Sequence, residues 1–351
     1  MVAAAGDYLT DVVERLGPAC DPASVRAGLE RACGGQLVAH GPTGGRASGL
    51  TLSGIPFEVS AVGGQGRYAP VVRYLTEAAT QATEFAARVD AQLAAIRDLA
   101  ASLPNGDETV AELFRSFIAT LYPEPAKIPA RVRFATWIGV VHDAAVPHHI
   151  ARLKVYGSPS IVPGAWDRLA AGWPGFAGLT SVSEHDELFK YAVVAVEVDA
   201  RGEVNHKVYL TSRDRDPAVP MKLVRHFGDP AWEALSELVR CGADPARLHD
   251  YDYFVCRSRS SEAAPSFALS VATRRIDDVT RIVDELAERH HGTTEAVDAL
   301  AQAARSHGAQ WRWSALGLGV SAEHGIDKLN VYGTPTWSDR PRAEAARTSG
   351  R

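Results

Sequence analysis

The chain has 351 residues, of which 46% are hydrophobic and 23% are charged, and its formal net charge is -5. This composition is typical of a globular protein with a substantial core and excludes general disorder. The slight acidic excess gives no reason to expect nucleic acid, so a local cluster of Lys and Arg would favour an anionic small molecule over a polyanion. No apolar run approaches the roughly eighteen residues of a membrane span, and no membrane partner is expected.

The four cysteines, Cys20, Cys33, Cys241 and Cys256, show no CxxC spacing, and no secretory signal precedes them. Reduced thiols in a cytoplasm are the simplest interpretation. The sequence therefore predicts a soluble cytoplasmic protein. A monomer or weak homodimer is expected, because no coiled-coil heptad or obvious interface stretch is present.

Two kinds of segment follow one another along the chain. Helical periodicity is found over 7–32 with a break at 17–18, 76–103, 109–122, within 164–179, 231–240, 276–291 and 294–307. Strand-like stretches are found over 49–60 in two pieces, 71–75, 132–142, 150–157, 189–198, the return after a turn at 200–203, 251–259, 265–273, 311–320 and 328–332. The polar tail 338–351 is expected to be disordered, which leaves 1–337 as a single domain.

The order of these elements is helix, strand, strand, helix, repeated roughly four or five times. Hairpin-linked antiparallel strands separated by helices cannot form a parallel doubly wound sheet, because each strand pair closes locally. About ten antiparallel strands with helices outside suggest a closed barrel, which is wide enough to hold a ligand in its lumen. The predicted fold is therefore α+β, a barrel ringed by helices.

A short strand pattern, a lysine and a tyrosine two residues apart, recurs along the chain. Because side chains alternate faces in a strand, both members of each pair lie on the same face. Two copies are Lys154-Val155-Tyr156 and Lys207-Val208-Tyr209. The third copy is Lys328-Leu329-Asn330-Val331-Tyr332, which has Asn330 where the others have lysine. Its lysine lies two residues earlier, on the same face of the strand. The tyrosines are separated by 53 and 123 residues. These separations fit a repeated unit of about 61 residues.

If the strands surround a lumen, these cations and phenols converge inside it, and Arg73 joins them from an earlier strand. Cations aimed into a low-dielectric cavity are costly unless an anion is bound, and a diphosphate would supply that anion. The tyrosine hydroxyls could bond phosphate oxygens while the rings shield a carbocation, each cation–π contact contributing about 0.5 to 2 kcal/mol. The alternative is that the lysines face water on a sheet surface, and the repetition argues against it.

Other motifs give weaker signals. His148-His149 and His290-His291 do not predict a metal site, because adjacent strand residues point apart and no HExxH completes a ligand set. No GxSxG supports a hydrolase. Gly63-Gly64-Gln65-Gly66 is predicted to be a turn and not a dinucleotide site, since no crossover helix follows it. The charge run 184–187 is interpreted as a solvated loop.

Four short motifs occur in a specific order: Gly54-Ile55-Pro56-Phe57-Glu58-Val59-Ser60, Val72-Arg73-Tyr74-Leu75-Thr76-Glu77, Leu153-Lys154-Val155-Tyr156 and Lys207-Val208-Tyr209. In order and approximate spacing they resemble the dimethylallyltryptophan synthase family of aromatic prenyltransferases, from about residue 8 to residue 337. The resemblance implies the αββα prenyltransferase barrel, ten antiparallel strands ringed by helices. It also implies that a prenyl diphosphate and an aromatic acceptor, the small-molecule partners, meet in the lumen.

The resemblance implies roles for particular residues. Glu58 matches the glutamate that accepts a hydrogen bond from the indole N–H. The diphosphate-binding cations correspond to Arg73, Lys154 and Lys207. The tyrosines that also bind the diphosphate and shield the cation correspond to Tyr156, Tyr209 and Tyr332. The family requires no metal cofactor, because protein cations do the work of magnesium, and the sequence contains no DDxxD.

The sequence departs from the family pattern at three places. Asn205 stands where the family often has arginine, and Ser270 stands where another tyrosine or phosphate ligand would be expected. The strand over 133–141 lacks the lysine that some fungal members use as proton acceptor. His142 is the candidate substitute for that base.

The resemblance predicts transfer of a dimethylallyl or longer prenyl group to an indole, such as L-tryptophan or a tryptophan-derived compound. The reaction expected is a Friedel–Crafts alkylation through an allyl cation. Within the same fold, the alternatives are an enzyme acting on tyrosine, a phenol or a peptide, and an enzyme that cyclises a terpenyl diphosphate. From another class, the alternative is a noncatalytic barrel that binds an anionic ligand.

Overall fold

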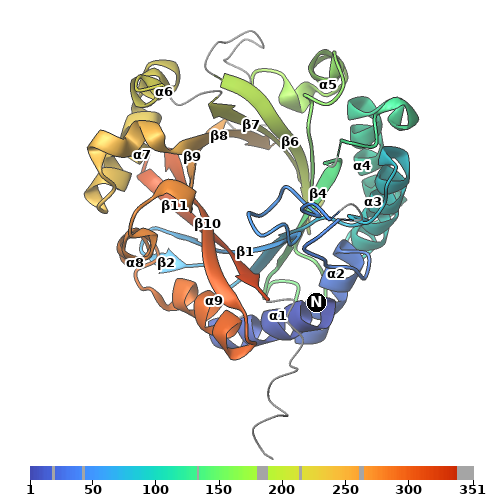
Figure 1. Ribbon diagram of the computed structural model, residues 1–351, viewed down its shortest axis with the longest axis horizontal. Helices are drawn as coiled ribbons and strands as arrows, with labels where there is room; N and C mark the ends of the chain where they lie inside the picture. Colours follow the sequence, from blue (N-terminus) through green and yellow to red (C-terminus); the bar gives the residue numbers. More distant parts are fainter. Residues whose placement is uncertain are drawn as a thin grey trace, which may run out of the picture.

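The computed structural model describes residues 1–17, 20–41, 44–132, 134–179, 189–212, 216–260 and 265–337. Both the charge run 184–187 and the tail 338–351 lie outside these residues. The described part forms a barrel of antiparallel strands with helices around the outside (Figure 1). No helix in it is long and apolar enough to cross a membrane.

The strands pair in one continuous ring. Their bounds are β1 Phe57–Gly64, β2 Arg67–Tyr68, β3 Val72–Thr76, β4 Thr136–His142, β5 Arg152–Gly157, β6 Phe189–Asp199, β7 Val204–Ser212, β8 Asp252–Ser260, β9 Ser266–Ala272, β10 Gln310–Ser321 and β11 Gly325–Thr336. The pairing order is β11-β10-β9-β8-β7-β6-β5-β4-β3-β1-β2, and β11 also pairs with β1. Ten strands therefore close the barrel, and the short β2 pairs at its rim with β1 alone. The predicted closed barrel is confirmed.

The helices follow the strand pairs, as the sequence predicts. Their bounds are α1 Val2–Leu16, α2 Pro22–Ala32, α3 Phe85–Ala100, α4 Glu108–Leu121, α5 Ala165–Gly172, α6 Val219–Phe227, α7 Asp229–Arg240, α8 Val279–His290 and α9 Glu295–Ser306. Asp21 and Asp107 begin α2 and α4 by accepting hydrogen bonds from the first free N–H groups of each helix. Helix α1 packs against α2 and α9, so the first and last helices are neighbours in the outer ring (Figure 1).

Two tight turns set the register of neighbouring strands. Gln65 and Gly66 have φ of 53° and 77° between β1 and β2, the left-handed geometry of a two-residue hairpin. Between β6 and β7, Asp199 Oδ1 accepts hydrogen bonds from the N–H groups of Arg201 and Glu203. A fixed register determines which side chains of one strand lie beside those of the next.

The helix predictions need correction at two places. The helix predicted from residue 76 begins at Phe85, because Glu77 is buried and hydrogen-bonded and Ala79 adopts φ of 56°. Helix α6 is not predicted at all, although Pro220 lies in its first turn, where proline is tolerated. Its buried residues Val219, Leu223 and Phe227 have helical spacing, a signal hidden by the two nearby prolines.

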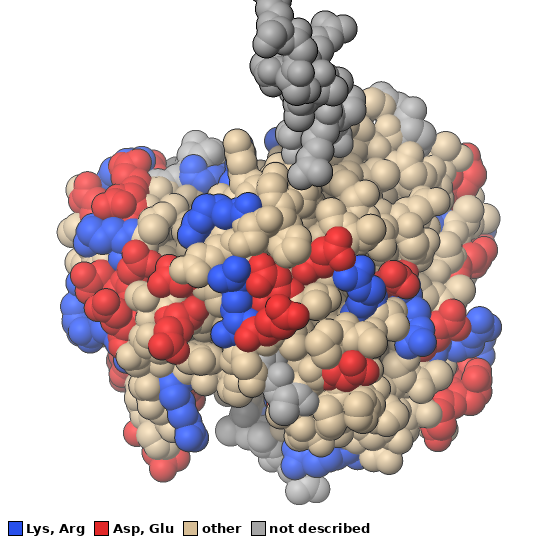
Figure 2. Space-filling view, turned by 90° about the horizontal axis from the view of Figure 1, so that it is seen from below, with Lys and Arg blue, Asp and Glu red and all other residues tan. Residues whose placement is uncertain are grey.

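The hydrophobic core lies between the barrel wall and the helices. In β5, Leu153 and Val155 are fully buried on the face toward the helices, whereas Lys154 and Tyr156 alternate with them and face the barrel interior. The barrel wall therefore has an apolar outer face and a polar, aromatic inner face. On the outer surface shown in Figure 2, acidic and basic side chains are interspersed, so this face has no extended patch of one sign.

Candidate active site

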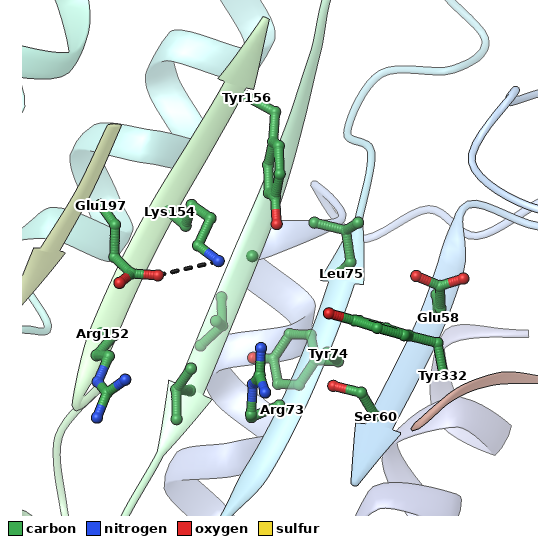
Figure 3. A pocket seen from close by; sticks show the side chains of 13 residues that line it. Glu58, Ser60, Arg73, Tyr74, Leu75, Arg152, Lys154, Tyr156, Glu197 and Tyr332 are labelled. Atoms are coloured by element: carbon green, nitrogen blue, oxygen red, sulfur yellow. Dashed lines mark ion pairs between the residues drawn. The ribbon is translucent and has the colours of Figure 1, made fainter. Parts of the chain in front are cut away.

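The inner face of the barrel gathers most of the predicted site residues. A pocket inside it is lined by Glu58, Ser60, Arg73, Tyr74, Leu75, Gly139, Val140, Val141, Arg152, Lys154, Tyr156, Glu197 and Tyr332 (Figure 3). Lys207 and Tyr209 join this set from β7, on the same face as Lys154 and Tyr156. The strands bring together residues that are up to 274 positions apart in the sequence, Glu58 and Tyr332.

A cluster of cations surrounds one carboxylate in this lumen. The Lys154 ammonium lies 3.0 Å from Glu197 Oε2, and the Lys207 ammonium lies 3.3 Å from Glu197 Oε1. Burial alone would raise the pKa of Glu197, but the two lysines lower it well below its usual value. Burial, and after it Lys154, lowers the pKa of Lys207. The lumen thus holds closely spaced positive charges that a bound anion would stabilise.

Two more cations of this region are Arg73 and Lys328. Arg73 donates a hydrogen bond to Asn330 Oδ1 at 2.7 Å, reaching across β1 to β11. Lys328 stands at the mouth of the barrel, where enclosure of its ammonium and then Arg73, Lys207 and Lys154 lower its pKa to about 7. The side chain remains exposed to solvent in that mouth, and the solvent limits the shift.

The tyrosines form an aromatic lining beside the cations. The rings of Tyr156 and Tyr209 lie 5.8 Å apart with a tilt of 39°, and the Lys154 ammonium lies 5.4 Å from the Tyr156 ring centre. Burial raises the pKa of Tyr156 to about 12 and also raises that of Tyr209 and that of Tyr332. All three phenols are therefore neutral at physiological pH and can donate hydrogen bonds.

Glu58 lies at a separate part of the lumen, next to Ser60 and Tyr332 (Figure 3). Its carboxylate Oε1 accepts a hydrogen bond from Ser314 Oγ at 2.6 Å. Burial raises its pKa to about 7, against the lowering effect of Ser314. A carboxylate of this kind can accept a hydrogen bond from a ligand N–H and can take up a proton near neutral pH.

His142 does not face the lumen, and its predicted role as a base is wrong. It is fully buried on the outer face of β4, where its Nε2 lies 3.4 Å from the Tyr74 hydroxyl and close to Gly28 of α2. Burial lowers its pKa to about 4. The inward positions of β4 are Trp137, Gly139 and Val141. The strand alternation, applied to His142, would have shown this.

The two other departures from the family pattern do face inward. Asn205 lies two residues before Lys207 on the same face of β7, and its Oδ1 is buried without a partner in the described residues. Ser270 of β9 packs against Gly317, where a Cβ atom would come within 2.9 Å of Ser270 Oγ. Glycine at position 317 therefore leaves the space that the serine hydroxyl occupies.

Glu197 is the principal residue of the site that the sequence analysis misses. It lies within the long apolar strand β6, between Val196 and Val198. A single carboxylate in such a strand must be paired if it is buried, and this signal could have predicted nearby cations. Its partners could not be identified from sequence, because they depend on the register of β5 and β7 with β6.

A second buried glutamate, Glu77, makes stability depend on pH. Its Oε2 accepts hydrogen bonds from Ser48 Oγ at 2.6 Å and from Trp137 Nε1 at 3.3 Å, and burial raises its pKa to about 7. Because the folded-state pKa is raised, the folded protein holds a proton that the unfolded chain releases from about pH 4 upward. This contribution is present at low pH and is lost as the pH rises through about 7.

In the wild type, this carboxyl should lower the free energy of unfolding by up to about 1.4 kcal/mol per pH unit between about pH 5 and pH 7, and we expect Glu77→Gln to abolish that part of the fall. The measurement is urea unfolding at several pH values, with Glu203→Gln, on the exposed β6–β7 turn, as control. An unchanged slope in Glu77→Gln would show that this carboxyl is ionised throughout the range.

No protein-family model matches this chain, and a search of curated proteins gives no match either. Its fold does match solved structures of prenyltransferases, so the fold is the prenyltransferase barrel that the sequence predicts.

One of these structures is 5-dimethylallyltryptophan synthase from Streptomyces coelicolor, at 19% identity and a TM-score of 0.69, covering 95% of this chain and 97% of that chain. A second is the prenyltransferase PriB in a ternary complex with L-tryptophan and dimethylallyl thiolodiphosphate, at 19% identity and a TM-score of 0.69, covering 97% and 99%. A third is 6-dimethylallyltryptophan synthase from Micromonospora olivasterospora with DMASPP and Trp, at 18% identity and a TM-score of 0.66, covering 94% and 95%. At these identities the likeness concerns the fold.

Proposed function

We propose that the protein is an aromatic prenyltransferase that moves a dimethylallyl or longer prenyl group from its diphosphate to an indole such as L-tryptophan. The observation that carries the proposal is the lumen itself, where cations, tyrosine rings and Glu58 meet. The fold supports it, because similar structures are tryptophan prenyltransferases and some contain a prenyl diphosphate analogue with tryptophan.

The first step proposed is ionisation of the donor. The allylic C–O bond breaks and its electron pair stays with the diphosphate, so negative charge develops at the leaving group. Arg73, Lys154 and Lys207 stabilise that charge, together with hydroxyl hydrogen bonds from the tyrosines. The rings of Tyr156 and Tyr209 keep water away from the allyl cation and interact favourably with it.

The second step proposed is attack by the aromatic ring. Glu58 accepts the indole N–H as a hydrogen bond, which makes the ring richer in electrons at the moment of attack. The new C–C bond forms, and the ring then loses a proton to restore aromaticity. His142 lies outside the lumen. Lys154 and Lys207 hold the pKa of the Glu197 carboxylate low, which makes it a weak base. The stronger bases in the lumen are the released diphosphate and the carboxylate of Glu58.

We also propose that neither a metal ion nor a second subunit takes part. The lumen cations supply positive charge at the leaving group, and the strands of this chain close the barrel around the site by themselves. The protein would then act as a monomer or weak homodimer. Turnover should consequently be insensitive to a chelator and proportional to protein concentration.

The test is incubation of the purified protein with dimethylallyl diphosphate and L-tryptophan, with and without EDTA, followed by mass analysis. The expected product is tryptophan heavier by one prenyl unit, formed in the presence of the chelator. If diphosphate is released without an adduct, the acceptor is wrong, and indoles, tyrosine and longer donors are then compared. Absence of both turnover and diphosphate binding would refute the proposal.

Diphosphate affinity should also fall as the pH rises above neutral. At the mouth of the barrel, desolvation and the neighbouring cations lower the pKa of Lys328, so this lysine loses its charge at a lower pH than a free lysine does. A bound anion raises its pKa again, and binding then requires proton uptake. Calorimetric titration with inorganic pyrophosphate from pH 6.5 to 9 should show a steeper loss of affinity for the wild type than for Lys328→Gln. Equal slopes would contradict a role for Lys328, because the ionisation of the probe is common to both proteins.

A further inference from the structure

Glu197 occupies a specific place among the predicted diphosphate-binding cations. Strand β6 lies between β5 and β7, and Glu197 is directly opposite Lys154 in the β5–β6 register. On the other side, Lys207 is diagonal to it, opposite Ala195. Each carboxylate oxygen contacts one ammonium, at 3.0 and 3.3 Å, and the three side chains are only 11–15% exposed. The carboxylate is therefore fixed between the two lysines (Figure 3 shows its ion pair with Lys154).

This position creates a competition when a diphosphate binds. Lys154 and Lys207 keep Glu197 ionised, as its lowered pKa shows. A diphosphate that contacts the same ammonium groups must place its oxygens near this carboxylate. Two charges of the same sign at such short range repel one another, and solvent screens them little where the side chains are only 11–15% exposed. Glu197 is carried by a strand that is paired on both sides, so its backbone stays beside the lysines when the anion binds.

The product is more sensitive to this repulsion than the substrate is. When the allylic C–O bond breaks, the diphosphate keeps the electron pair and gains one negative charge relative to the ester. A lumen with cations alone would hold this product more tightly than the donor, and release would become slow. The fixed carboxylate of Glu197 repels the more negative diphosphate product more strongly than it repels the donor.

We propose that Glu197 is a positioning residue that holds Lys154 and Lys207 in the empty lumen and promotes release of the diphosphate product. The inference rests on the proposed function, because it requires that a diphosphate bind at these lysines. In this role Glu197 does not stabilise the charge of the leaving group. Its negative charge weakens the binding of the diphosphate after the reaction.

The test compares the dissociation constant of inorganic pyrophosphate for the wild type, Glu197→Gln and Glu203→Gln. Glutamine keeps the size of the side chain and removes its charge, so Glu197→Gln should bind pyrophosphate about tenfold more tightly. Glu203→Gln removes the same charge from the exposed β6–β7 turn and should bind as the wild type does. In steady-state assays, Glu197→Gln should also show a lower KM for the donor, a lower kcat and stronger inhibition by pyrophosphate.

If the unpaired lysines prevent Glu197→Gln from folding, the effect of Glu197 on pyrophosphate binding can be measured in a variant that lacks one of the two lysines. The double variant Lys207→Gln/Glu197→Gln should then bind pyrophosphate more tightly than Lys207→Gln alone. Unchanged or weaker binding on removal of Glu197, in either background, overturns the inference while leaving the diphosphate site in place. If the wild type binds no pyrophosphate, the proposed function fails and the inference fails with it.

Discussion

Replacing Lys154 with alanine is expected to lower the rate of prenyl transfer by about 10²–10³-fold, because one charge that stabilises the leaving diphosphate is lost. The Lys154 side chain is 11% exposed, and its ammonium lies beside both Glu197 and the Tyr156 ring. Without Lys154, Glu197 is paired with Lys207 alone, so the donor diphosphate meets a less positive lumen. The measurement is single-turnover formation of the prenylated product at saturating acceptor.

The control for this variant is Lys222→Ala, which removes a lysine from α6 that pairs on the surface with Asp216 at 2.9 Å. It should leave the rate within about twofold of the wild type, as surface charges contribute little. Pyrophosphate binding should be weakened in Lys154→Ala and unchanged in Lys222→Ala. Normal turnover in Lys154→Ala would remove this lysine from the diphosphate site.

Glu58→Gln is expected to lower aromatic prenylation by about 10²-fold while ionisation of the donor continues. Glutamine can still accept the hydrogen bond from Ser314, but it lacks the negative charge that makes the indole ring more reactive. The allyl cation should then be captured by water more often. The ratio of prenyl alcohol to prenylated acceptor should therefore rise, and both products can be measured in one chromatographic run.

The pH dependence provides a second test of Glu58. Its raised pKa of about 7 means that the carboxyl becomes ionised as the pH rises through neutrality. If the ionised form is required, kcat/KM for the acceptor should fall below about pH 7 in the wild type, and this acid limb should be absent from Glu58→Gln. An identical acid limb in both proteins would assign that titration to another group and contradict the role of Glu58.

The positions of the lumen residues follow from strand geometry alone. Lys154 and Tyr156 share a face because they are two residues apart, and apolar Leu153 and Val155 identify the opposite face as the one under the helices. The same rule places Lys207 with Tyr209. Since antiparallel hairpins close locally, the order of strands around the barrel also follows from their order in the sequence.

Residues whose role depends on pairing between strands could not be predicted in this way. The ion pair of Glu197 with Lys154 exists because β5 and β6 have one particular register. The hydrogen bond from Arg73 to Asn330 crosses an intervening strand, which no local pattern indicates. His142 shows a different failure, because its residue type suggested a base while its place in the alternation of β4 put it outside the barrel.

A crystal structure of the protein with dimethylallyl thiolodiphosphate and L-tryptophan would locate both substrates relative to the lumen residues. The expected result is a diphosphate contacting Arg73, Lys154 and Lys207, with the prenyl chain against the tyrosine rings and the indole N–H directed at Glu58. A diphosphate bound outside the lumen, for example in the outer recess lined by Arg31 and His148, would contradict the account.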